Sequence, residues 1–122
     1  RSLKTASSER KIPLAGHSLW AAQRIMCNHG GHLHAFPRYN ARGTTSANSA
    51  SAALNKWLKD FVEKGCTIHS FRHSFRDRLR AVSCPSDIID QLGGWRTAGV
   101  GQGYGEGYPV SVMADWVKKI AG

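Results

Sequence analysis

Apolar residues recur at intervals of three and four along three stretches of the chain, and this spacing predicts amphipathic helices. The first stretch, 51–64, is followed by Gly65, a residue typical of a helix end. The second, 67–82, carries two histidines and four arginines, and the third, 110–120, lies near the C-terminus. The expected apolar stripes are Leu54, Trp57, Leu58 and Phe61; Phe71, Phe75, Leu79 and Val82; and Val110, Met113, Trp116, Val117 and Ile120.

The remaining segments predict two more helices, a hairpin and a loop. Residues 18–27 have Ser18 as a possible N-cap, and 84–94 begin near Pro85 and end in paired glycines. Residues 1–14 are expected to form two short strands around the turn "TASSE", and 28–49 a long loop. The sequence thus predicts one α+β domain over its whole length, mostly helical with a small N-terminal β-hairpin.

A strong excess of positive charge points to a polyanionic partner. Lys and Arg number 17 against 8 Asp and Glu, which gives a formal net charge of +9. Nucleic acid fits this surplus better than a membrane does, and a basic surface without a specific partner is the alternative. The sequence has no run of 18 apolar residues and no apolar signal-peptide core. Three cysteines without a pairing pattern favour a reducing compartment, so a cytoplasmic location is expected.

The most informative motif lies in "TIHSFRHSFRDRLRA". His69 and Arg72 are three residues apart, and on a helix this spacing places both side chains on one face. An arginine fork fits paired phosphate oxygens, and the histidine adds a hydrogen-bond donor or a proton carrier. The pair therefore suits a phosphodiester, whereas the motif taken alone favours a solvated basic helix.

The run "LGGWRTAGVGQGY" places Trp95 after a helix end and Tyr104 nine residues later. With His69, Arg72, Trp95 and Tyr104 in this order, the sequence resembles the tyrosine recombinases, or phage-type integrases. The segments "RSLKT" and "SERKIPL" are similar to the β-hairpin of that family and put Lys4 at the position of its catalytic lysine, with Lys11 a weaker candidate. The resemblance covers residues 3–108.

One departure from the family pattern concerns a second catalytic arginine, which the family carries on a helix upstream of the hairpin. Only two residues precede Leu3 here, and the next arginines along the chain come too late in the order. The resemblance therefore implies an N-terminally truncated part of the catalytic domain. Such a part is expected to expose an apolar face that includes Trp57 or Phe61.

The resemblance implies site-specific DNA recombination, in integration or excision, by strand cleavage and rejoining. Tyr104 would attack a phosphodiester and form a 3′-phosphotyrosyl link. Arg72 and the indole N–H of Trp95 would stabilise negative charge in the transition state. His69 would donate to phosphate or accept the tyrosine proton, and Lys4 would protonate the leaving 5′ oxygen. The reaction conserves the phosphoester energy, so neither a cofactor nor a metal is expected.

The implied partners are double-stranded DNA and further copies of the chain, as a tetramer on synapsed DNA. The C-terminal helix would either couple neighbouring protomers or pack within its own chain. Tyr108, which precedes Pro109, is expected to pack rather than to react. The side chains expected to contact DNA are His73, Arg76, Arg80 and Arg96.

Structural alternatives exist for these assignments. Trp95 could be a core anchor, Tyr104 a turn residue and Lys4 a solvated strand residue. For the whole chain, one alternative is a non-catalytic DNA-binding fragment or a decayed integrase. Another is a zinc-stabilised domain, although the compressed spacing matches none of the usual zinc fingers. Its candidate ligands are Cys27, His29, His32 and His34.

Overall fold

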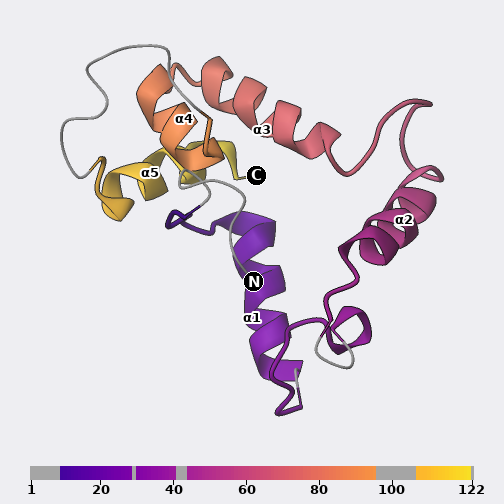
Figure 1. Ribbon diagram of the computed structural model, residues 1–122. Helices are drawn as coiled ribbons and strands as arrows, with labels where there is room; N and C mark the ends of the chain where they lie inside the picture. Colours follow the sequence, from indigo (N-terminus) through magenta and orange to yellow (C-terminus); the bar gives the residue numbers. More distant parts are fainter. Residues whose placement is uncertain (1–8, 29, 41–43, 96–106, 122) are drawn as a thin grey trace. The chain divides into compact units, whose positions relative to one another are not determined.

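The computed structural model of the protein describes residues 9–28, 30–40, 44–95 and 107–121 (Figure 1). These residues are mostly helical, and none of them is in a β-strand. The chain divides into two compact units, one made of residues 1–20 with 74–122 and the other of residues 21–73. The helices are α1 (Gly16–Asn28), the 3-10 helix η2 (Pro37–Tyr39), α2 (Ala47–Leu58), α3 (Ser70–Ala81), α4 (Ser86–Gly93) and α5 (Val110–Ile120).

The hydrophobic core lies in the first unit, where the end of α3, α4 and α5 pack together (Figure 1). Leu79 of α3 and Leu92 of α4 are its most deeply buried side chains. From α5 the core takes Met113, Val117 and Ile120, with Trp116 packed against it, so this helix packs within its own chain. Val110, the first residue of the predicted stripe, is 41% exposed, so its predicted burial is wrong. The core residues are Leu79, Cys84, Ile88, Ile89, Leu92, Met113, Val117 and Ile120.

Helix α4 begins and ends where its sequence predicts. Pro85 is the N-cap, and its fixed φ suits the start of a helix. Gly94 is the C-cap in the left-handed conformation, with φ of 64°, which costs a glycine little.

Helix α2 begins at Ala47, within the segment expected to be a loop, and ends at Leu58 rather than near Lys64, so both of its predicted ends are wrong. Beyond Leu58 the chain makes tight turns, in which the Phe61 N–H donates to the Leu58 carbonyl at 2.9 Å. The Asn55 Oδ1 accepts from the Ile68 N–H at 2.7 Å and so ties the returning chain to the helix. The expected helix stop at Gly65 is therefore wrong, and this glycine instead occupies a turn with φ of 99°.

Two of the predicted apolar stripes are buried only in part. Trp57 and Phe61 are 57% and 67% exposed, in agreement with the expected open face. Phe71 is 60% exposed, so its predicted burial is wrong. The core reaches α3 only from Phe75 onward, and Phe71 lies one turn too early to meet it.

The N-terminal segment has no strand over residues 9–15, where the second arm of the hairpin was expected, and residues 1–8 lie outside the described part. Arg10 instead donates from Nε to the Leu92 carbonyl at 3.0 Å, at the end of α4. Helix α1 starts two residues before Ser18, so Ser18 is not its N-cap. The Ser18 hydroxyl donates to the Ala15 carbonyl at 2.7 Å and holds the start of the helix.

None of the helices in the described ranges combines the length and the apolar content that crossing a membrane requires.

Candidate functional site

The His-x-x-Arg motif lies where α3 begins, in the unit of residues 21–73. His69 immediately precedes the helix and is exposed, whereas Arg72 is half-buried in its first turn. The Arg72 backbone N–H donates to the His69 carbonyl at 3.0 Å, which brings the two residues into one turn. The His69 and His73 rings meet edge to face, with centroids 5.4 Å apart. The structure thus places two imidazoles and one guanidinium in the first turns of a single helix.

Arg76 is held inside the first unit rather than on an open surface. Its Nη2 lies 3.7 Å from Oδ1 of Asp90, whose side chain is only 9% exposed. Its guanidinium carbon lies 5.0 Å from the centre of the Trp95 ring, within the range of a cation–π contact. Arg76, which was expected to contact DNA, thus has two partners within the fold, while 38% of its side chain remains exposed. The buried carboxylate explains this position, since a charge in an apolar core requires a cationic partner.

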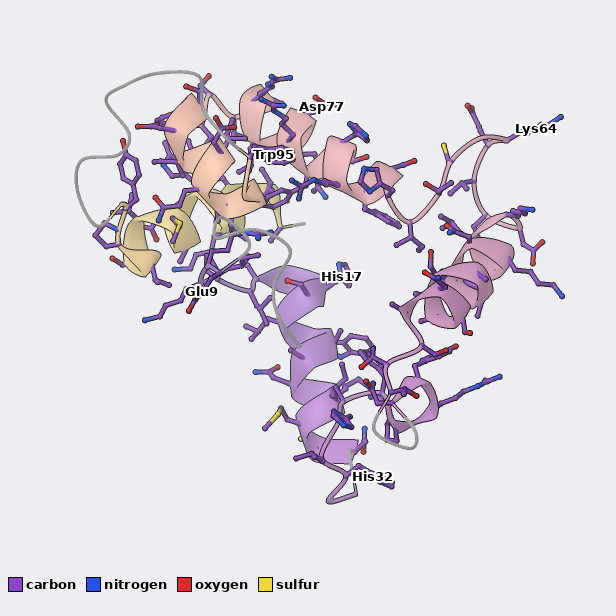
Figure 2. The ribbon with its side chains drawn as sticks, in the orientation of Figure 1. Glu9, His17, His32, Lys64, Asp77 and Trp95 are labelled. Atoms are coloured by element: carbon purple, nitrogen blue, oxygen red, sulfur yellow. The ribbon has the colours of Figure 1, made fainter. Side chains whose placement is uncertain are left out.

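Trp95 follows the end of α4 and packs against the hydrophobic core, between α3 and α4 in Figure 2. Its backbone N–H donates to the Asp90 carbonyl at 3.0 Å. The ring also lies directly over Gly93, where an added Cβ would overlap it. Trp95 is therefore a core anchor, as one of its two interpretations predicted.

Side chains on one face of α4 form hydrogen bonds with Tyr108, which lies just before α5. The Gln91 side-chain amide donates to the Tyr108 carbonyl at 3.0 Å and accepts from the Tyr108 N–H at 2.8 Å. The Tyr108 hydroxyl donates to Oδ2 of Asp87, one turn earlier on α4, at 2.5 Å. Gly107 has φ of 75°, and an added Cβ there would lie 2.9 Å from the Gln91 Oε1. Tyr108 is thus held to α4 by hydrogen bonds rather than by burial, since it is 37% exposed and lies outside the core.

Hydrogen bonding between the side chains of Asp87 and Tyr108 shifts the pKa of both. The hydroxyl bond lowers the pKa of the Asp87 carboxyl, because it stabilises the carboxylate. The same bond raises the pKa of the Tyr108 phenol, because ionisation would remove the donated proton. The phenol of Tyr108 therefore ionises less readily than that of an ordinary tyrosine.

Two arginines of α3 are exposed to solvent. Arg78 and Arg80 are both exposed, and Arg80 lies 3.7 Å from Asp77 in an exposed pair of small energetic weight. These side chains can reach a phosphate backbone. Of the other expected site residues, Lys4, Arg96 and Tyr104 lie outside the part of the chain that the structure describes.

Three polar residues that organise the first unit were not predicted from the sequence: Arg10, Asp90 and Gln91. The signal for Asp90 was present, since a carboxylate between Ile89 and Leu92 interrupts an apolar face and calls for a cation. The contacts of Arg10 and Gln91 had no local signal, because their partners lie far along the chain.

The rival zinc site finds no support in the described geometry. Cys27, His32 and His34 are exposed, and His29 lies outside the described residues. Throughout the described ranges, no three His, Cys, Asp or Glu side chains come together as a metal site would require.

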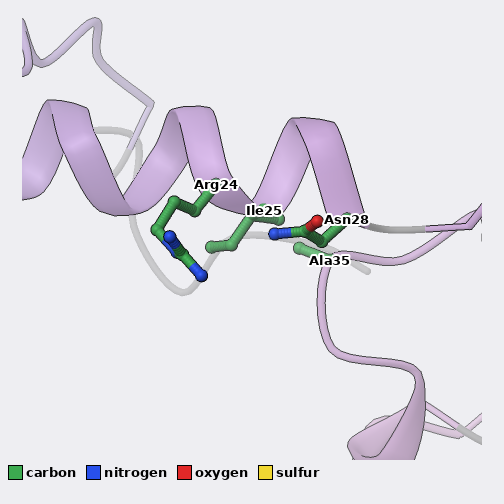
Figure 3. Close-up of a pocket in the computed structure, with 4 residues that line it drawn as sticks. All are labelled: Arg24, Ile25, Asn28 and Ala35. Atoms are coloured by element: carbon green, nitrogen blue, oxygen red, sulfur yellow. The ribbon is translucent and has the colours of Figure 1, made fainter.

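A shallow hollow of about 280 Å³ lies beside the second half of α1 (Figure 3). Arg24, Ile25 and Asn28 of this helix line it together with Ala35. None of the residues predicted for catalysis or DNA contact contributes to this hollow.

Compared with known proteins, the chain matches no family model, no curated sequence and no solved structure.

Proposed function

We propose that the protein cleaves and rejoins DNA as a site-specific tyrosine recombinase. The observation that carries the proposal is the order and spacing of His69, Arg72, Trp95 and Tyr104 along one strongly basic chain. Double-stranded DNA is the substrate, and a tetramer on two synapsed DNA sites is the working assembly. No cofactor enters the reaction, since each step exchanges one phosphoester for another.

The proposed reaction starts when the Tyr104 hydroxyl oxygen attacks the scissile phosphorus. A P–O bond to the tyrosine forms, the P–O5′ bond breaks, and the leaving 5′ oxygen takes a proton, with Lys4 as the proposed donor. Arg72 pairs with the non-bridging oxygens, where negative charge accumulates. A 5′-hydroxyl of a second DNA end then attacks the phosphotyrosine and releases Tyr104.

The choice of Tyr104 over Tyr108 has support from the described residues. The Tyr108 hydroxyl is engaged by Asp87, its pKa is raised, and its backbone is fixed by Gln91. Tyr108 is 37% exposed, so the difference lies in its raised pKa, which makes its phenol ionise less readily than that of an ordinary tyrosine.

The test is covalent capture with the full-length protein encoded by the gene that contains this chain. A nicked DNA substrate, from which the cleaved end diffuses away, traps the phosphotyrosyl adduct. We expect an adduct with the wild type and with Tyr108→Phe, and none with Tyr104→Phe, whose DNA affinity should be unchanged. An adduct that survives Tyr104→Phe and is lost with Tyr108→Phe would contradict the assignment.

A second candidate function, DNA binding without catalysis, is favoured by the exposed arginines of α3 and the net charge of +9. It predicts affinity for duplex DNA that falls steeply with salt, because each phosphate contact releases counterions. Arg80→Ala should lower the salt slope by about 1, whereas Gln23→Ala on α1 should leave it unchanged. Binding with this dependence, but no adduct from the wild type, would favour the second function over the first.

A further inference from the structure

Besides its packing against the core, Trp95 makes two contacts that involve Asp90 or its partner Arg76. The Asp90 carbonyl accepts from the Trp95 backbone N–H, and its carboxylate lies 3.7 Å from the Arg76 guanidinium. That guanidinium in turn lies over the Trp95 ring at 5.0 Å. Asp90 therefore fixes both the backbone of Trp95 and the cation that covers its ring.

This arrangement controls the orientation of the indole. A cation over an aromatic face is attracted by the negative charge of that face, and the attraction is strongest where water is excluded. The indole N–H lies in the plane of the ring, so a fixed ring plane also fixes the direction in which this group donates. Hydrogen bonds weaken steeply with misalignment, and a small tilt of the ring would weaken one to a phosphate.

We propose that Arg76, held by Asp90, is a positioning residue that orients Trp95 for the reaction and is not a DNA contact. This inference rests on the proposed function and on the role that the family resemblance implies for Trp95, whose indole N–H would donate to the phosphate. It reassigns Arg76, which the sequence placed among the DNA-binding residues. The side chain of Arg76 is only 38% exposed and already has two partners within the fold.

A double-mutant cycle tests the proposal, with the rate of adduct formation at saturating DNA as the readout. Arg76→Met keeps most of the apolar stem but removes the charge, and Trp95→Phe keeps a ring but removes the N–H. We expect Arg76→Met to slow adduct formation about tenfold in the wild-type background. In the Trp95→Phe background it should have less than a twofold further effect, because the group it orients is already absent.

A purely structural role for Arg76 would give a different result. Loss of stability would slow adduct formation by the same factor in both backgrounds, and that outcome would overturn the inference. Arg76→Lys keeps a charge beside Asp90 and should recover part of the rate. It replaces Arg76→Met in the cycle if the methionine variant fails to fold. Asp90→Asn should reproduce the defect of Arg76→Met and add nothing to it.

DNA affinity separates positioning from contact. Arg76→Met should leave the affinity and its salt dependence unchanged, whereas a lost phosphate contact would lower the salt slope by about 1. Arg78→Met on the exposed face of α3 is the comparison, and it should lower the slope. A lower slope with Arg76→Met would refute the inference while leaving the proposed function intact. Absence of an adduct from the wild type would instead refute the proposed function, and the inference with it.

Discussion

The side-chain amide of Gln91 binds the backbone of Tyr108 in both directions, as donor and as acceptor. This pairing resembles one rung of a β-ladder, with a side chain in place of the second strand. The two hydrogen bonds fix the position of Tyr108 against α4. Because Pro109 follows directly and is the N-cap of α5, they also fix where α5 begins.

Replacing Gln91 with alanine should therefore destabilise the fold. Both hydrogen bonds to Tyr108 are lost, and since each contributes about 1 kcal/mol, we expect a decrease of about 1–2 kcal/mol in the free energy of unfolding. Denaturant titration measures the change, with Gln23→Ala on the exposed face of α1 as the control. Equal stability of the two variants would mean that the pairing does not hold α5 in place.

The hydrogen bond between Tyr108 and Asp87 should make stability depend on pH at both ends of the range. The pKa of Asp87 is lowered on folding, so its contribution is present above about pH 4 and is lost as the pH falls through the folded value. The pKa of Tyr108 is raised, so its contribution is present below about pH 10 and is lost as the pH rises through the folded value.

The measurement for this bond is the difference in unfolding free energy between the wild type and Tyr108→Phe. It should be largest near neutral pH and shrink toward both extremes. A difference that stays constant from pH 3 to pH 11 would show that the hydroxyl makes no bond of consequence.

Replacing either of two apolar residues of α3 by alanine should have very different effects on stability. Leu79 is fully buried, and Leu79→Ala should cost about 2–5 kcal/mol through lost contacts and the cavity left behind. Phe71 is exposed, and Phe71→Ala should change stability by less than about 0.5 kcal/mol. Thermal and denaturant unfolding of both variants compare them directly, and a large loss with Phe71→Ala would place that ring in a core.

Gly93 should tolerate a side chain only when the Trp95 ring is replaced by a smaller side chain. In the wild type, Gly93→Ala brings a methyl group into the indole ring and should lower stability despite the better helix propensity of alanine. In a Trp95→Ala background the overlap is gone, and the same change should be neutral or stabilising by up to about 1 kcal/mol. Equal effects in both backgrounds would exclude the contact as the cause.

Local patterns predicted the helices well, because helix periodicity and capping act within a few residues. The positions of α4 and α5 agree with their apolar spacing and with Pro85, Gly94 and Pro109. The early end of α2 was missed, since it depends on the bond between Asn55 and Ile68 across thirteen positions. At the site, the backbone bond from the Arg72 N–H to the His69 carbonyl joins the two residues of the motif in one turn, whereas their common ligand stays a prediction.

The position of Arg76 was missed for a similar reason. A pattern of arginines on a helix gives no information on which of them finds a buried carboxylate. Which arginine pairs with the buried carboxylate depends on how α3 packs against α4. Local sequence does not show this packing, because the paired residues, Arg76 and Asp90, lie fourteen positions apart.

The bond from Arg10 to the Leu92 carbonyl has a consequence for the rate of folding. The unit that contains both residues is built from two segments, and 53 residues of the other unit separate these segments along the chain. The bond can form only after α4 is in place, and closing so long a loop costs entropy. Refolding of the first unit is therefore expected to be slow for a helical protein of this size.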